Sequence, residues 1–329
     1  MKKNIALVTG GFSGEAVISY KSAVTIDNNL DRSHFNVYKI DINPQGWFHE
    51  LNDGRKVNID KNDFTLPIDN QPVHFDAVFI GMHGTPGEDG KLQGYFDTLK
   101  IPYTGCDAAT SALTFNKRYA VAVAGMAGIA VSRSVLLMKE NYKGPAEILN
   151  TLKFPLFIKP NNGGSSIGMS KVDNAGDGLE SAIEKAFKED DQVLVEEMIQ
   201  GREFTVGVFK SQGNIIVLPL TEVKAHSDKA FFDFEAKYQG KSTETTPAEV
   251  DEVIADKVRE TARKVYEVFN CRGVVRIDFI YNEKEGRPYM LEVNTIPGQS
   301  EASIVPQQVK AMGWSLKEFY TKLVEEAWV

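Results

Sequence analysis

The sequence predicts an α/β protein with two or three domains, on three observations. The chain has 329 residues, which exceeds the usual size of a single hydrophobic core. About the first 100 residues alternate short apolar runs with helical patterns, which is typical of a parallel sheet covered by helices. The composition, 42% hydrophobic and 25% charged, is that of a globular protein rather than a disordered or fibrous one.

The first segment begins with an apolar run at residues 4–9. Two lysines precede it, as in a signal peptide, but the run is shorter than a signal peptide's apolar core, so a buried strand fits better. Further strands are predicted at 35–42 and 77–81, and helices at 16–30 and 92–99. The glycine-rich residues 10–15 lie between the first strand and the first helix, where open α/β sheets bind ligands. A simple turn is the alternative.

The second segment, residues 101 to about 195, has a lysine at the end of a predicted strand. An apolar run leads to Lys159, and the glycine- and serine-rich residues 161–168 follow it. Glycines let the backbone approach a ligand, and amides and hydroxyls bind oxygen atoms, so this loop suits phosphate. It is not a Walker A loop, because the lysine precedes the glycines; a generic turn is the alternative. The other predicted elements are a helix carrying Lys117, a helix at 179–187 and a strand from Gln192.

The third segment, from about residue 201, contains a pair of strands with polar side chains at 276–294. Arg276 and Asp278 share one strand face, and so do Glu292 and Asn294, because residues two apart in a strand point the same way. If the strands pair with these faces aligned, one patch holds a guanidinium, two carboxylates and an amide oxygen, a set that suits Mg²⁺. A structural salt bridge is the alternative. The other predicted elements are strands at 203–209 and 215–220, a helix at 249–269 and a helical pattern at 305–328.

Residues 224–246 are predicted to be irregular. A loop of this length in a compact domain is usually a lid or a binding loop. A surface excursion is the alternative, although four aromatic residues are more than a solvated loop needs. Its candidate functional side chains are His226, Asp233, Glu235, Lys237 and Tyr238.

Charge and cysteine content narrow the class of protein. A net charge of -8 argues against a nucleic-acid binder, which would show a basic face. No apolar window approaches the length of a membrane span. Cys106 and Cys271 have no metal-site spacing and are too few for a disulfide framework, which predicts a reducing compartment and a cytoplasmic protein.

Six motifs follow one another in a recognisable order. They are Glu15 after Gly-Gly-Phe-Ser, His83-Gly-Thr-Pro-Gly-Glu-Asp-Gly-Lys-Leu-Gln-Gly94, Lys159-Pro-Asn-Asn-Gly-Gly-Ser-Ser-Ile-Gly, Glu235-Ala-Lys-Tyr238, Arg276-Ile-Asp278 and Glu292-Val-Asn294-Thr-Ile-Pro-Gly298. Together they resemble the D-alanine:D-alanine ligases of the ATP-grasp superfamily. The resemblance implies a three-domain ATP-grasp fold: a Rossmann-like parallel-sheet domain (1–104), a central subdomain (105–195) and a C-terminal subdomain (196–329) with a lid at 224–246.

The resemblance also implies an activity. Such a ligase transfers the γ-phosphoryl group of ATP to one D-alanine and lets the amino group of a second displace phosphate from the D-alanyl phosphate. The dipeptide enters peptidoglycan. Two Mg²⁺ or Mn²⁺ ions would bind Asp278, Glu292 and Asn294, with a monovalent cation such as K⁺ as a further candidate. By the same resemblance the partners are small molecules and a second copy, in a homodimer that meets through the N-terminal domain.

The resemblance assigns roles residue by residue. ATP would contact Lys117, Lys159, Ser165, Ser166, Glu196, Glu197, Met198, Ile199, Glu203, Lys237 and Asn294. The amino acids would contact Glu15, His83, Arg276, Gly298, Ser303 and Ile304. Catalysis would involve Glu15, linked through Ser165 to Tyr238, together with Lys237 on the transferred phosphoryl group. Arg276 and the Gly298 amide would stabilise the oxyanion.

Two alternatives stay open at this point. One is another ATP-grasp ligase, such as a D-alanine:D-lactate ligase; those enzymes generally lack the lid tyrosine that matches Tyr238. The other is a nucleotide-binding module without catalysis, although no metal ligand or phosphate-binding lysine is missing from the motifs. One departure concerns the second substrate: residues 299–302 lack the histidine that many members carry beside the serine that matches Ser303.

Overall fold

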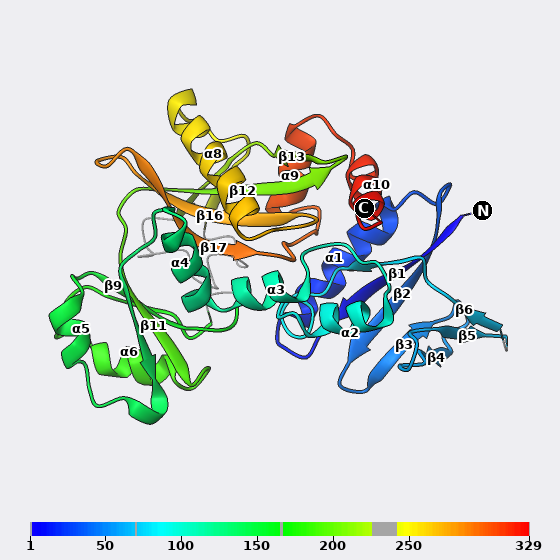
Figure 1. Cartoon of the computed structure of the whole chain (residues 1–329), viewed down its shortest axis with the longest axis horizontal. Helices are drawn as coiled ribbons and strands as arrows, with labels where there is room; N and C mark the ends of the chain where they lie inside the picture. The colour runs from blue at the N-terminus through cyan, green and yellow to red at the C-terminus, as the bar shows by residue number, and fades with distance from the viewer. Residues whose placement is uncertain (1, 70, 165–166, 226–241, 329) are drawn as a thin grey trace.

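The computed structural model describes residues 2–69, 71–164, 167–225 and 242–328. Within these ranges, three larger sheets lie in N-terminal, central and C-terminal parts of the chain, each accompanied by helices (Figure 1). A small separate sheet pairs β5 (Leu66–Ile68) with β6 (Gln71–Val73). This mixed α/β architecture confirms the predicted fold class.

The N-terminal sheet has the strand order β4-β3-β2-β1-β7. Its centre is parallel, as predicted, because β1 pairs in parallel with β2 and β7. Strands β3 and β4, which extend the sheet with antiparallel pairs, were not predicted from the sequence. The elements of this part are β1 (Lys3–Gly10), α1 (Ala16–Asn29), β2 (Phe35–Asn43), β3 (Gly46–Glu50), β4 (Lys56–Asn58), β7 (Ala77–Ile80) and α2 (Lys91–Leu99).

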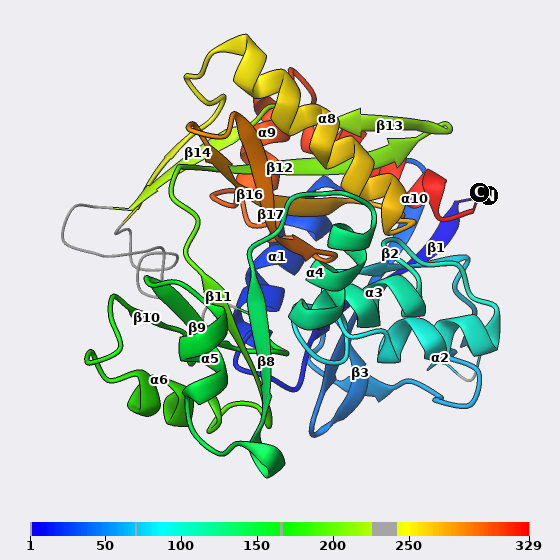
Figure 2. The same cartoon turned by 60° about the vertical axis from the view of Figure 1, so that its left-hand side comes forward.

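The central sheet is antiparallel and has the order β10-β9-β11-β8. Apolar side chains of α5 and α6 pack with those of the strands in one buried cluster, and Figure 2 shows both helices beside β9 and β10. Two helices, α3 (Ala108–Phe115) and α4 (Lys117–Met126), precede this sheet. Its elements are β8 (Ser134–Met138), the short 3-10 helix η1 (Lys139–Asn141), α5 (Ala146–Thr151), β9 (Leu156–Pro160), β10 (Ser170–Val172), α6 (Leu179–Ala186) and β11 (Gln192–Glu197).

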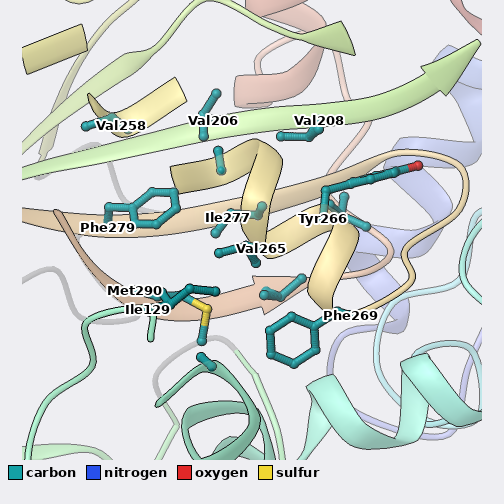
Figure 3. Packing of buried hydrophobic residues seen from close by; sticks show 14 of the residues in the cluster. Ile129, Val206, Val208, Val258, Val265, Tyr266, Phe269, Ile277, Phe279 and Met290 are labelled. Carbon is teal, nitrogen blue, oxygen red and sulfur yellow. The ribbon is translucent and has the colours of Figure 1, made fainter. Parts of the chain in front are cut away.

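The C-terminal sheet has the order β15-β14-β12-β16-β17, with β13 also paired to β12. One face of this sheet is covered by α8, whose Val258, Val265 and Tyr266 pack against Val206 and Ile277 (Figure 3). On the opposite face, side chains of residues 305–319 cover Gly207 and Phe209, which leaves the part beside Thr205 and Asp278 for a ligand. The elements are β12 (Arg202–Ser211), β13 (Asn214–Val217), β14 (Thr221–Ala225), β15 (Ser242–Thr245), α8 (Glu252–Val268), β16 (Val275–Asn282) and β17 (Arg287–Asn294).

The helical pattern at 305–328 forms two helices, α9 (Ile304–Ala311) and α10 (Leu316–Glu326). A new helix begins because the Ser315 hydroxyl accepts the Glu318 N–H, which caps α10 separately. The apolar face of α10 joins a cluster with β1, α1 and β12 residues, so the C-terminal end of the chain packs against its beginning (Figure 1).

The expectation that 224–246 is irregular throughout is wrong at both ends. Residues 224 and 225 complete β14, and β15 runs antiparallel to it. Local alternation was too short there to separate a strand from a loop. Residues 226–241 lie outside the described ranges. Among the residues that the structure describes, no helix combines the length and apolar character needed to cross a membrane.

Candidate active site

Two adjoining cavities, of about 610 and 300 Å³, lie over the open face of the C-terminal sheet. Both are lined by Glu15 at the start of α1, Lys117 at the start of α4, and Asp278 and Glu292 on β16 and β17. All three parts of the chain therefore contribute to one continuous site. The shared side chains lie where the two cavities meet.

The β16–β17 hairpin has the register that the sequence predicts. Arg276 is paired with Asn294, and Asp278 with Glu292. Side chains of directly opposed residues lie on the same sheet face, so all four polar groups project from one side. Alternate residues such as Ile277 belong to the core under α8.

A β-bulge adjusts this hairpin beside the site. The pairing passes from Asp278 and Glu292 to Phe279 and Met290, which leaves Leu291 without an opposite residue. Leu291 and Glu292 both line the larger cavity. An extra residue locally re-aims the neighbouring side chains. The bulge therefore lets Glu292 face the site while Met290 stays in the core.

Asp278 is held by several donors. The Arg276 guanidinium donates two hydrogen bonds to its carboxylate, from Nε at 2.9 Å and from Nη2 at 2.7 Å, and the buried Thr205 hydroxyl donates a third. The Asn294 amide lies 3.5 Å from both the Asp278 and Glu292 oxygens. The salt bridge considered from the sequence is therefore present, but it lies inside the site.

The donor set fits a hard divalent cation. Asp278, Glu292 and Asn294 bring two carboxylates and an amide oxygen to one strand face, and Mg²⁺ usually binds one or two carboxylates together with substrate phosphates. Across the described ranges, no group of three or more His, Cys, Asp or Glu side chains could hold a metal by itself. A cation here would therefore need oxygen atoms from a ligand as well.

Two lysines project into the larger cavity from different elements. Lys159 on β9 forms a buried ion pair with Glu196 on β11. Lys117 donates from Nζ to the Gly163 carbonyl at 2.6 Å, in the loop that follows β9. Lys159, the lysine predicted at the end of a strand, therefore lines the same cavity as the glycine-containing loop, as a phosphate site requires.

The larger cavity is also lined by other predicted nucleotide contacts. Glu197, Met198, Ile199 and Glu203 all line it. The Glu197 carboxylate accepts the Lys153 N–H at 3.0 Å, and the Met198 N–H donates to the Pro155 carbonyl at 2.8 Å. These contacts fix the strand end that borders the cavity.

Glu15 lies in the smaller cavity and also borders the larger one. The loop after β9 comes close to it, because a Cβ atom added to Gly164 would lie 2.6 Å from Glu15 Oε1. A side chain at position 164 would therefore displace the carboxylate or the loop. The glycine that the sequence analysis associated with phosphate also makes room for Glu15.

His83 is buried against α1 and the segment after β17. Its Nε2 lies 2.9 Å from the Ser22 hydroxyl. The imidazole also donates a hydrogen bond to the Ile296 carbonyl. Burial lowers the pKa of His83 to about 4, with the Arg276 charge adding to the shift and the Ile296 carbonyl opposing it. At neutral pH the imidazole is therefore uncharged.

Glu88 is a site residue to which the sequence analysis assigned no role. It lines the smaller cavity, and its carboxylate accepts the Gly84 N–H at 2.6 Å. Burial and the nearby Glu15 carboxylate raise its pKa, since both disfavour a second negative charge. The available signal was its place five residues after His83 in the second motif.

The N-terminus of α9 closes the other end of the smaller cavity. Gly298, Ser303 and Ile304 all line it. A Cβ atom at Gly298 would lie 2.9 Å from Ser303 Oγ, so glycine permits the close approach of these two segments. The first N–H groups of a helix and its dipole favour an anion at this position.

The predicted site residues Ser165 and Ser166, and the candidates of the predicted lid (His226, Asp233, Glu235, Lys237 and Tyr238), lie outside the described residues. The structure brings the other predicted site residues together around the two cavities. Their placement agrees with a site that accepts a phosphate-bearing ligand next to a smaller zwitterion. The individual roles stay predictions.

Comparison with known proteins finds relatives that match this chain over nearly its whole length. The family models described as D-ala D-ala ligase N-terminus and C-terminus match residues 4–106 and 123–325. A D-alanine–D-alanine ligase from Flavobacterium johnsoniae is 43% identical over 323 residues, which cover 98% of each chain.

Solved structures show the same relationship. The VanG D-Ala:D-Ser ligase from Enterococcus faecalis superposes with a TM-score of 0.89 at 32% identity, covering 99% of this chain and 100% of that one. A D-alanine–D-alanine ligase from Bacillus anthracis complexed with ATP has a TM-score of 0.78 at 26% identity, with coverage of 99% and 97%. This chain belongs to the D-alanine–D-alanine ligase family.

Proposed function

We propose that this chain joins two D-alanine molecules into D-alanyl-D-alanine with the consumption of ATP, for peptidoglycan synthesis. The observation that carries the proposal is the β16–β17 hairpin, which presents Arg276, Asp278, Glu292 and Asn294 where the two cavities meet. A phosphoryl donor in the larger cavity and an amino acid carboxylate in the smaller one would meet at this hairpin. The family membership and the solved relative with bound ATP support the same reaction.

ATP is proposed to occupy the larger cavity. Lys117 and Lys159 would neutralise its phosphates, and Glu196 and Glu203 would contact the adenine and ribose, while the cavity volume of about 610 Å³ suits a nucleotide. Asp278, Glu292 and Asn294 would hold the Mg²⁺ or Mn²⁺ ions. A bound cation supplies charge neutralisation during phosphoryl transfer, which depends mainly on positioning and electrostatics.

The first D-alanine is proposed to bind between Glu15 and Arg276. The Glu15 carboxylate would accept hydrogen bonds from its ammonium group, and the neutral His83 would lie near its carboxylate. After phosphoryl transfer, the second amino group attacks the acyl carbon and phosphate leaves. Arg276 and the Gly298 N–H would donate to the oxyanion of the tetrahedral intermediate, where fixed donors are most effective.

The test is a dipeptide assay with D-alanine, ATP and Mg²⁺, in which phosphate and D-alanyl-D-alanine are measured together. We expect equal amounts of both products. Robust turnover with D-lactate or L-alanine and none with D-alanine would replace this proposal with another ligase activity. Turnover without any acceptor-dependent product would contradict the ligase assignment altogether.

We also infer a cytoplasmic homodimer. The free, buried Cys106 and Cys271 are compatible with a reducing compartment. On α1, the exposed Val17, Tyr20 and Val24 lie on one helical face and offer an apolar surface for a second copy. Sedimentation of the purified protein tests the dimer, and a Val17→Glu, Val24→Glu variant should sediment as a monomer.

A further inference from the structure

Glu244 on β15 is a carboxylate for which the sequence predicts no role, yet it lines the smaller cavity. Arg276, Ser303 and Ile304 line the same cavity. Glu244 is half-buried and lies outside every motif that carries the family resemblance. Strand β15 was not predicted from the sequence, and its pairing with β14 is what places Glu244 in the site.

The strand register places Glu244 on the site face of the sheet. Glu244 is paired with Val223, and Val223 with Glu203. Directly opposed residues share a face, so the side chains of these three residues project to the same side. Residues two apart also share a face, which adds Thr205, the partner of Asp278, to this set. Glu244 therefore belongs to the floor of the active site.

A glutamine on α9 connects Glu244 to the N-terminus of that helix. Gln307 Nε2 lies 3.5 Å from Glu244 Oε2 and donates to the Ala302 carbonyl at 2.8 Å. The next residue, Gln308, fixes the helix on β12 by accepting the Gly207 N–H at 2.9 Å and donating to the Thr205 carbonyl at 2.9 Å. The carboxylate is thus held beside the turn that begins with Ser303.

The charges around this turn match the two ends of an amino acid. The N-terminus of α9 favours a carboxylate. An ammonium group on the same molecule then requires an anion nearby, because an unpaired charge in a cavity is costly. Burial raises the pKa of Glu244, while Gln307 and the Arg276 charge oppose that shift. A cationic ligand beside Glu244 would also lower its pKa, as Gln307 and Arg276 do, and so favour the charged carboxylate.

We propose that Glu244 binds the amino group of the second D-alanine and so makes this subsite selective for an amino acid over a hydroxy acid. The inference rests on the proposed function and gives each D-alanine its own carboxylate, Glu15 for the first and Glu244 for the second. An amino group donates to a carboxylate both as ammonium and as the neutral amine that attacks. A hydroxy acid such as D-lactate offers one O–H donor and no positive charge.

The test is the Glu244→Gln variant, which keeps the size of the side chain and removes its charge. Initial rates over a range of D-alanine concentrations give separate KM values for the first and second molecules. We expect the second KM to rise about 10- to 100-fold, as for a lost hydrogen bond to a charged group. The KM values for the first D-alanine and for ATP stay unchanged. In mixtures, the ratio of D-lactate to D-alanine incorporated rises.

Two further variants separate charge from structure. Gln307→Met removes the tether but keeps the Glu244 charge, so it should raise the second KM less than Glu244→Gln does. Glu244→Asp keeps the charge on a shorter side chain and should restore part of the preference for D-alanine over D-lactate; it also serves if Glu244→Gln does not fold. Glu249→Gln, a change of an exposed charge shortly after β15, is the matched control and should behave as the wild type.

The outcomes are distinct. A second KM and a D-lactate ratio unchanged in Glu244→Gln would overturn the inference while leaving dipeptide synthesis intact. Equal effects of Gln307→Met and Glu244→Gln would also overturn it, because the carboxylate would then act only as a structural strut. If the wild-type protein forms no dipeptide from D-alanine, the proposed function fails, and the inference fails with it.

Discussion

Thr205 bears directly on the proposed metal site, although it has no predicted role as a ligand. Its buried hydroxyl donates to Asp278, so it orients a carboxylate that is proposed to hold the cation. We expect Thr205→Val, which keeps the shape of the side chain, to weaken Mn²⁺ binding about 10- to 100-fold, as is usual for partners of metal ligands. Electron paramagnetic resonance of Mn²⁺ measures this without turnover. Thr261→Val, on α8 and outside the lining of both cavities, is the control and should leave Mn²⁺ affinity unchanged.

His83 makes stability depend on pH. Its pKa is about 4 in the folded protein and about 6.5 in an unfolded chain. Between these values the unfolded chain binds the extra proton, so the stabilisation is complete above pH 6.5 and is lost as the pH falls toward 4. The loss amounts to about 3 kcal/mol.

Urea unfolding of the wild type and His83→Gln across this pH range tests the assignment. The difference in unfolding free energy between the two proteins should shrink as the pH falls, because glutamine does not titrate. Glu88 contributes with the opposite sign, since its raised pKa makes the folded protein bind more protons. Glu88 is present in both proteins, so its contribution largely cancels in the difference between their unfolding free energies. A difference independent of pH would contradict the buried, neutral imidazole.

At the scale of elements, the cap at the start of α4 also positions Lys117, which is proposed to bind the ATP phosphates. The Asn116 side chain caps α4 by accepting the Tyr119 N–H at 3.0 Å, and its amide donates to Asn162 at 3.1 Å. This places Lys117 against the loop after β9. Asn116→Ala should cost about 1 kcal/mol of stability and raise the KM for ATP.

Asp251→Ala is the matched control for this prediction. Asp251 caps α8 by accepting the Val253 N–H at 2.8 Å, and it does not line either cavity. Its loss should cost a similar free energy of unfolding and leave the KM for ATP unchanged. Equal KM values in both variants would mean that α4 does not position Lys117 for the nucleotide.

Local sequence patterns predicted some strands of the sheets and not others. The hairpin at Arg276 was predictable because its polar residues recur with a period of two and its alternate residues are apolar. Glu244 could not be predicted as a site residue, because the four-residue strand β15 is recognised only by its pairing with β14. The same applies to β3 and β4, where tertiary pairing rather than local propensity decides the structure.

At the scale of the whole molecule, α10 joins the N-terminal and C-terminal sheets. Phe319 is fully buried in a cluster with Ile5 and Leu7 of β1, and its ring contacts Phe209 of β12 at 5.2 Å between centroids. Phe319→Ala should lower the free energy of unfolding by about 3–5 kcal/mol, through lost burial and a cavity. Urea unfolding measures the change. Met126→Ala, at a side chain that is 90% exposed, should alter stability by less than about 0.5 kcal/mol.

The assembly of the site was harder to predict than its parts. Sequence patterns indicated that Lys159 and Asp278 could bind a phosphate and a metal, but no local pattern places two such distant segments around one cavity. That proximity came from the family resemblance, and the structure agrees with it. Glu88 was missed because its effect depends on Glu15, which is remote in sequence and close only in the folded chain.

The register of the β16–β17 hairpin also restricts how the length of this chain can change. Deleting Ile277, for example, would place Arg276 and Asp278 on opposite faces of the sheet, one toward the cavities and one toward α8, because adjacent residues of a strand face opposite ways. Residues 283–286, which join the strands, are free of that restriction. Insertions in related chains should therefore accumulate in this turn and be excluded from the strands on either side of it.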